Sequence, residues 1–250
     1  MIQLKNSAQL KDMRDAGRIT AQALLVAEEA IREGVSTYEV DAKIRSFIEK
    51  CGAKPSFLGL YGFPGSACIS INDQVIHGIP SKKVILREGD IVKVDVGAFF
   101  HGFHGDSART FPVGNISDEA KRLIEATKLC FERGFEQVKE GNRIGDIGNA
   151  VESCAKSYGY SVVRKYIGHG VGRDVHEAPD VPNFGTAGRG PRLCRGMAIA
   201  IEPMINVGSG DVKEMPDGWT VLTVDGKLSA HYENTVALTD DGPIILTDPN

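Results

Sequence analysis

The sequence lacks the features that would place it outside the ordinary globular classes. It has no apolar stretch long enough to span a membrane, and its N-terminus has no apolar core of signal-peptide length. Its five cysteines form no CxxC pair, and their odd number and scatter favour a reducing compartment over a disulfide framework. Strong charge of one sign is also missing, because the net charge is −4, so nucleic acid is not expected as the main ligand. A cytoplasmic globular protein is therefore expected.

The composition is typical of a folded enzyme-sized domain. Apolar residues make up 42% and charged residues 25% of the 250 positions, which is enough chain to bury a full core. No low-complexity segment or long linker divides the chain. One large domain, or two small ones, is expected on length alone.

Apolar residues recur at steps of three or four in two pairs of segments, which predicts two pairs of helices. In the first pair, Gly34 ends one helix, and Ser36 with Glu39 forms a capping box for the next. In the second pair, Ser117 caps a helix that is expected to end at Gly141, and another helix follows. Segments with strand patterns come after each pair: CISIN and DIVKVDVGAFF in the first half, and SVVRKYI, MAIAIEPMI and HYENTVAL in the second.

The two halves of the chain resemble each other. Glu33-Gly34 and Glu140-Gly141 are 107 residues apart (140 − 33), and at the same offset Asp95 falls on Glu202. Two further matches lie off that register: His77-Gly-Ile-Pro80 with His176-Glu-Ala-Pro179, and His104-Gly-Asp106 with His231-Tyr-Glu233. We therefore predict an α+β fold of two pseudosymmetric halves, roughly 1–112 and 113–250, that join around one site in a single domain spanning 1–250.

Four acidic residues follow or end the predicted strands. The segment around residues 91–110 predicts a hairpin centred between residues 100 and 101, which places Asp95 opposite Asp106. Glu202 follows the apolar run MAIAI, and Glu233 lies in HYENTVAL. Strand alternation directs Arg109 to the face opposite Asp106. If the halves pack with pseudosymmetry, the four carboxylates converge, and two divalent ions would neutralise them.

His169, in IGHGVG, adds a nitrogen donor whose flanking glycines let backbone approach closely. Oxygen-rich ligation with one imidazole fits Mn²⁺, Fe²⁺ or Co²⁺ better than a structural thiolate zinc site. Two such ions, roughly 3.5–4 Å apart, can activate a water molecule as a nucleophile and polarise a carbonyl group. The sequence thus predicts a hydrolytic dinuclear centre held by Asp95, Asp106, His169, Glu202 and Glu233.

The other histidines and most of the cysteines are not expected to take part in the reaction. We expect His101 and His104 to be turn or surface residues. His231 either lines the site or packs beside it. The cysteines are expected to fill the core, with the exception of Cys68.

Five motifs reveal a resemblance that runs along essentially the whole chain: CISINDQVIHGIP (68–80), VDVGAFFHGFHGDSART (94–110), GHGVGRDVHEAP (168–179), MAIAIEPMI (197–205) and DGWTVLTVDGKLSAHYENTV (217–236). In order, spacing and number they resemble those of the type I methionine aminopeptidases, in the short bacterial form without an N-terminal extension. The resemblance implies the pita-bread (creatinase/aminopeptidase) fold, removal of the initiator methionine from nascent proteins and peptides, and a preference for small second residues.

The resemblance also implies roles for individual residues. Asp95 would chelate one ion with both oxygens, Asp106 and Glu233 would bridge the two ions, and His169 and Glu202 would complete the other sphere. Glu202 would also handle the proton of the nucleophilic water. His176 would hydrogen-bond the scissile carbonyl, and His77 would contact the scissile amide nitrogen. An imidazole with a pKa near neutrality suits both tasks. The methionine pocket would be lined by Phe57, Phe63, Cys68 and Trp219.

The chain departs from the family pattern at a few pocket positions. Leu60 stands where a tyrosine is common, with Tyr61 next to it, and Val175 stands where some members have an aromatic residue. His231 replaces a glutamine that many members carry. None of these departures removes a metal ligand, so they bear on pocket shape and on tolerance at the second substrate residue.

Alternatives remain within and outside this reaction class. Xaa-Pro peptidases and creatine hydrolases share the fold but usually carry an extra N-terminal domain, and type II methionine aminopeptidases have a long insertion. A non-catalytic peptide or nascent-chain binding protein would be expected to lose ligands, and a structural metal site would be closed by protein ligands. A monomer is expected, and a contact with the ribosome is left open.

Overall fold

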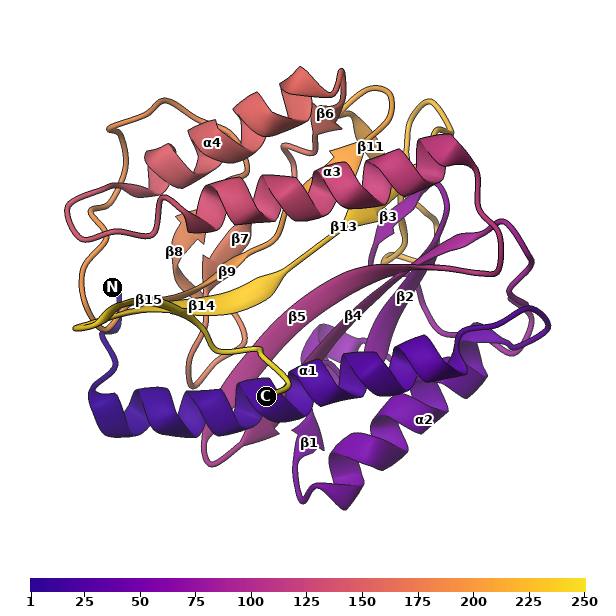
Figure 1. Cartoon of the computed structure of the whole chain (residues 1–250). Helices are drawn as coiled ribbons and strands as arrows, with labels where there is room; N and C mark the ends of the chain where they lie inside the picture. Colours follow the sequence, from indigo (N-terminus) through magenta and orange to yellow (C-terminus); the bar gives the residue numbers. More distant parts are fainter.

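The computed structural model describes all residues of the chain, 1–250. Its helices form the two predicted pairs: α1 (Ser7–Ala30), α2 (Thr37–Lys50), α3 (Asp118–Phe135) and α4 (Ile144–Ser157). The first pair lies on one side of the strands and the second pair on the other (Figure 1). None of the helices combines the length and the apolarity that a bilayer crossing requires.

The predicted N-terminal caps are present, but Gly34 does not end the first helix, because α1 stops at Ala30 with Ile31 as its C-cap. Ser36 and Glu39 form the capping box of α2, and the Ser117 side chain accepts a hydrogen bond at the start of α3. The end of α3 was predicted wrongly: the helix stops at Phe135, before Gly141. It stops there because the following residues turn back, which lets Val138 enter the core shared by α3 and α4.

The strands form four sheets. A 4-stranded sheet in the first half has the order β1-β4-β2, with β5 also paired to β4, and a 5-stranded sheet in the second half has the order β15-β14-β9-β7-β8. Two 3-stranded sheets have the orders β13-β10-β6 and β11-β12-β3. The bounds are β1 Lys54–Pro55, β2 Ala67–Ile71, β3 Gln74–Ile76, β4 Ile91–Phe100, β5 Phe103–Pro112, β6 Ser161–Val162, β7 Gly168–Gly170, β8 Glu177–Val181, β9 Ala198–Ile201, β10 Met204–Asn206, β11 Val212–Glu214, β12 Val221–Thr223, β13 Ser229–His231, β14 Asn234–Thr239 and β15 Gly242–Ile245.

The β4–β5 hairpin turns one position later than predicted. His101 and Gly102, with φ of 50° and 83°, form its two-residue turn, because such turns need positive φ at both central positions. Gly97, and not Asp95, is therefore the partner of Asp106. Because the turn moves by one position, the cross-strand partner of each residue moves by two. Asp95 and Asp106 therefore remain on the same face of the hairpin.

Three predicted strand segments are shorter than expected or interrupted. MAIAIEPMI breaks at Glu202-Pro203 into β9 and β10, which belong to different sheets. Only Ser161–Val162 of SVVRKYI is a strand, because the chain then leaves the sheet and directs Tyr166 to a hydrogen bond with Glu214. HYENTVAL is interrupted at Glu233, between β13 and β14. The break lets the backbone of Glu233 pair with a residue of the other half.

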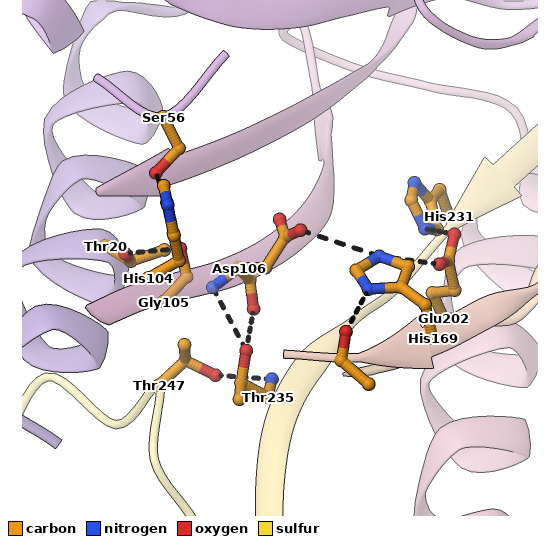
Figure 2. A network of polar contacts seen from close by, with 11 residues as sticks. Thr20, Ser56, His104, Gly105, Asp106, His169, Glu202, His231, Thr235 and Thr247 are labelled. Atoms are coloured by element: carbon orange, nitrogen blue, oxygen red, sulfur yellow. Dashed lines mark hydrogen bonds and ion pairs between the residues drawn. The ribbon is translucent and has the colours of Figure 1, made fainter. Parts of the chain in front are cut away.

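The two halves meet where β5 runs beside this break. Glu233 N–H donates to the carbonyl of Ala108 at 2.9 Å, and Ala108 N–H donates back at 3.4 Å. Thr235 Oγ1 accepts the N–H of Asp106 at 3.0 Å and donates to its carbonyl at 2.8 Å (Figure 2). We call this line of contacts, from Asp106 to Ala108 and from Glu233 to Thr235, the seam.

Candidate active site

The predicted site residues line one cavity of about 320 Å³. It opens between the two halves, because residues of β4 and β5 face residues of β7 and of the segments that follow β9 and β13. Its walls include every residue predicted to act: Asp95, Asp106, His169, Glu202, Glu233, His77, His176, Phe57, Phe63, Cys68 and Trp219.

The predicted metal ligands come together at the seam. Ligand atoms of Asp106, His169 and Glu233 all lie within 4.8 Å of one another. His169 Nε2 is 3.7 Å from Asp106 Oδ2 and 3.5 Å from Glu202 Oε1, and Figure 2 shows the imidazole between these two carboxylates. Asp95 lines the same cavity and lies on the same face as Asp106.

Burial and mutual repulsion make the carboxyl groups of this cluster weak acids when no metal ion is bound. Burial raises the pKa of Asp95 to about 7. Burial, followed by the charges of neighbouring carboxylates, also raises the pKa values of Asp106, Glu202 and Glu233 well above their ordinary range. Arg109 lowers the pKa of Glu233 without reversing its rise. As predicted, Arg109 lies on the face opposite Asp106, and its guanidinium donates to the backbone carbonyl of Glu233.

Buried oxygen atoms without hydrogen-bond partners indicate whether the residues of the cluster fit a divalent metal ion. Oδ1 of Asp95 and Oδ1 of Asp106 are buried without a hydrogen-bond partner, a condition that costs free energy. His169 Nδ1 is 2.9 Å from the carbonyl of Gly170, so Nδ1 carries the proton and Nε2 presents a lone pair to the carboxylates. Burial lowers the pKa of His169 to about 4, which keeps the ring neutral. Carboxylate oxygens with one neutral imidazole are a fitting donor set for such an ion.

The two histidines of the HxxP repeat stand in different walls of the cavity. The ring of His176 lies 4.4 Å from that of His169, edge to face, and 6.1 Å from that of Tyr61. The ring of His77 lies 5.7 Å from Tyr166. Burial, followed by the charge of His176, lowers the pKa of His77 to about 4, so this imidazole is neutral at pH 7.

An apolar compartment adjoins the carboxylates. Phe57, Phe63, Cys68 and Val175 form one buried cluster, and Trp219 packs on it with its ring 5.0 Å from that of Phe63. Aromatic and sulfur groups of this kind suit an unbranched thioether side chain. Sequence patterns did not single out Ile79, Tyr166 and Asp180, although each lies within four residues of a histidine that they did indicate.

The remaining histidines lie outside the cavity wall, and the cysteines form no disulfide bonds. His101 is an exposed turn residue, as predicted. The prediction of a turn or surface position for His104 was wrong, because this residue is half-buried in β5 with Nδ1 2.8 Å from Ser56 Oγ. His231 packs beside the cavity: it is 1% exposed, and its Nε2 lies 3.8 Å from Glu202 Oε2. All five cysteines are free.

Comparison with known proteins gives one consistent picture. The model of metallopeptidase family M24 matches residues 11–240. The chain is 55% identical to the methionine aminopeptidase of Clostridium perfringens and 49% identical to methionine aminopeptidase 1 of Bacillus subtilis, with 99% of each chain covered in both cases.

Solved structures agree. The crystal structure of methionine aminopeptidase from Thermotoga maritima superposes with a TM-score of 0.97 at 40% identity, over 99% of this chain and 100% of that one. A prolidase from Pyrococcus furiosus has a TM-score of 0.79 at 26% identity, and the match covers 66% of its length. The α+β pita-bread fold is therefore confirmed. The chain belongs to metallopeptidase family M24 and, within it, to the methionine aminopeptidases.

Proposed function

We propose that this protein is a metal-dependent aminopeptidase that removes the N-terminal methionine from nascent proteins and peptides. One observation carries the proposal: a cluster of four carboxylates, two buried and two part-buried, and one neutral imidazole adjoins an apolar compartment of phenylalanine, tryptophan and cysteine side chains. The first feature fits metal-assisted hydrolysis, and the second fits the side chain that is released.

We assign the ligands of two divalent ions, Fe²⁺, Mn²⁺ or Co²⁺, to Asp95, Asp106, His169, Glu202 and Glu233. When bound, such ions polarise the scissile carbonyl and lower the pKa of water. Asp95 would hold one ion, His169 with Glu202 would hold the other, and Asp106 and Glu233 would contribute to holding both. Glu202 is the residue suited to accept a proton from the attacking water, because its carboxylate lies in the cavity, 3.5 Å from Nε2 of His169.

The chain's own residues would bind and orient the substrate. Phe57, Phe63, Cys68 and Trp219 would enclose the methionine side chain and exclude water from it. His176 would donate a hydrogen bond to the scissile carbonyl oxygen, and His77 would contact the scissile amide nitrogen. Both rings are neutral near pH 7, because burial lowers their pKa values, so each can donate from one nitrogen.

The wider setting is also proposed. The cavity takes its walls from both halves, which supports one catalytic domain over 1–250 with halves near 1–112 and 113–250. Five free cysteines fit the reducing cytoplasm, where nascent chains are the available substrate. We propose that the enzyme works as a monomer, because no wall of the cavity needs a second copy. A ribosome contact would deliver nascent chains directly.

Release of methionine from Met-Ala-Ser tests the proposal. Metal-stripped protein should be inactive, and separate titration with Mn²⁺, Fe²⁺ and Co²⁺ should restore release with at least one of them. An Xaa-Pro dipeptide assayed in parallel should stay intact. Cleavage of the Xaa-Pro peptide without cleavage of Met-Ala-Ser would instead assign the chain to the prolidase-like branch of the fold, and binding without cleavage of either would indicate a non-catalytic peptide-binding protein.

A further inference from the structure

A buried ion pair lies directly behind the loop that carries His176. Lys5 Nζ is 2.6 Å from Glu177 Oε2, and the two side chains are only 4% and 5% exposed, although 172 residues separate them. Burying two charges is costly, and removing either one leaves its partner uncompensated. Nothing in the proposed reaction uses Lys5 or Glu177 directly, so the pair calls for another role.

Lys5 is held firmly on its own side. Its N–H donates to the carbonyl of Gly196 at 2.7 Å, which ties it to the chain just before β9, and Nζ also donates to the carbonyl of Gln3 at 3.0 Å. The next residue, Asn6, closes the capping box of α1. The backbone of Lys5 is thus held between the start of α1 and the segment before β9, and its ammonium group is held by Gln3 and Glu177.

The carboxylate of Glu177 accepts hydrogen bonds from the loop between β7 and β8. Its Oε1 accepts the N–H of Arg173 at 2.8 Å, and a Cβ on Gly172 would lie 2.3 Å from the same atom, so a larger residue there would displace the carboxylate. Burial alone would raise the pKa of Glu177, but the hydrogen bond and charge of Lys5, with the N–H groups of Asp174 and Arg173, hold it below its ordinary value. The carboxylate is therefore an anion around which the loop folds.

His176 immediately precedes β8, which begins at Glu177, so the two residues share one peptide bond while their side chains have different neighbours. The imidazole of His176 lines the cavity, while the carboxylate of Glu177 meets Lys5. The backbone of Glu177 is also paired with Gly170, the residue after His169. Displacement of the Glu177 carboxylate would release the N–H groups of Arg173 and Asp174, and with them the backbone that leads into His176.

We propose that Lys5 and Glu177 form a strut that positions His176 for catalysis. Neither residue touches the substrate; both are positioning residues that act through the loop 172–176. The proposal rests on the proposed aminopeptidase function for its kinetic consequence, whereas its structural consequence, the placement of the His176 ring, stands apart from that function.

The test compares Lys5→Met with wild type, with Glu177→Gln, and with Lys121→Met as the matched control. Lys121 forms an exposed pair with Asp118, so its loss should leave the cavity unchanged. Glu177→Gln keeps an acceptor oxygen for the loop and therefore keeps the test open if Lys5→Met does not fold. The kcat and KM for Met-Ala-Ser are measured well below each melting temperature, and the His176 ring resonance is followed by NMR, assigned with His176→Asn.

We expect kcat to fall by about tenfold to 10²-fold in the strut variants, with KM changed by less than about twofold, because a small misplacement of a catalytic group acts on the transition state. The double variant should be no slower than the slower single variant. The His176 resonance should shift while that of His77 stays in place.

If the His176 resonance does not shift in the Lys5 and Glu177 variants, or if it shifts while kcat stays at the wild-type value, the proposed positioning role is refuted. If wild type fails to cleave Met-Ala-Ser, the proposed function fails instead, and the His176 resonance alone decides whether the strut exists.

Discussion

Replacing Asp95 with asparagine should make the metal-free protein more stable than wild type at neutral and alkaline pH. Burial raises the pKa of Asp95 from 3.8 to about 7. A carboxyl group whose pKa is raised on folding contributes stability below its unfolded pKa and loses it as the pH rises through its folded pKa. For Asp95 this window runs from pH 3.8 to about 7. The asparagine side chain does not titrate, so the Asp95→Asn variant does not lose stability at this position as the pH rises.

The magnitude follows from the size of the shift. About three pH units at about 1.4 kcal/mol each give a loss on the order of 4 kcal/mol across the window. The buried histidines and Lys93 also titrate and impose their own pH dependence, but they are common to both proteins and largely cancel in the difference. The quantity to measure is therefore the free energy of unfolding of Asp95→Asn minus that of wild type.

Urea denaturation in EDTA at pH 4.5, 6 and 7.5 measures this difference, which should grow with pH. Asp241→Asn, at an exposed site, should show no such growth. Mn²⁺ at 100 times its Kd should narrow the difference at pH 7.5, since it stabilises only the protein that binds it, by about 2.7 kcal/mol. A difference that is flat or falls with pH would refute the view that uncompensated carboxylates dominate the metal-free site.

Four further predictions concern single residues. Asp106→Asn should lose the second equivalent of Mn²⁺ in calorimetry together with methionine release, and full activity would contradict a two-ion site. Trp219 is the only tryptophan, so free methionine should change the emission spectrum of the protein, and an unchanged spectrum would argue against the assigned pocket. Gly105→Ala should destabilise the protein by about 1–3 kcal/mol in urea, because its Cβ would lie 2.7 Å from the Cα of Gly17 and force α1 away from β5. Leu123→Ala, in the fully buried core under α3, should cost about 2–5 kcal/mol in the same assay without changing KM.

Local patterns in the sequence were sufficient for the helices and for the convergence of the carboxylates. The Ser36 capping box and the helical spacing around it are encoded within a few residues, so they could be predicted directly. The internal match between the halves brought Glu202 and Glu233 to Asp95 and Asp106 without any knowledge of the packing. The family resemblance then supplied the roles of His77 and His176, which composition and spacing alone did not determine.

Features that depend on turn geometry or on distant partners were missed. The hairpin register was wrong by one turn position because two residues with positive φ, one of them His101, decide it. His104 was misplaced because its partner, Ser56, lies 48 residues away. The pair of Lys5 with Glu177 left no trace in the sequence either, since neither residue stands in a pattern that depends on the other.

The seam would make the proposed metal centre depend on how the two halves assemble. Asp106 is tied by Thr235 and Glu233 by Ala108, so each of these ligands is held in place by the opposite half of the chain. The affinity for the ions would then depend on how closely the two halves pack together. Neither half would form the centre by itself, because each supplies only some of the ligands. A genetic screen for weakened ion binding should consequently return substitutions such as Thr235→Val alongside the ligands, and a folding experiment that follows ion uptake will report the last docking step.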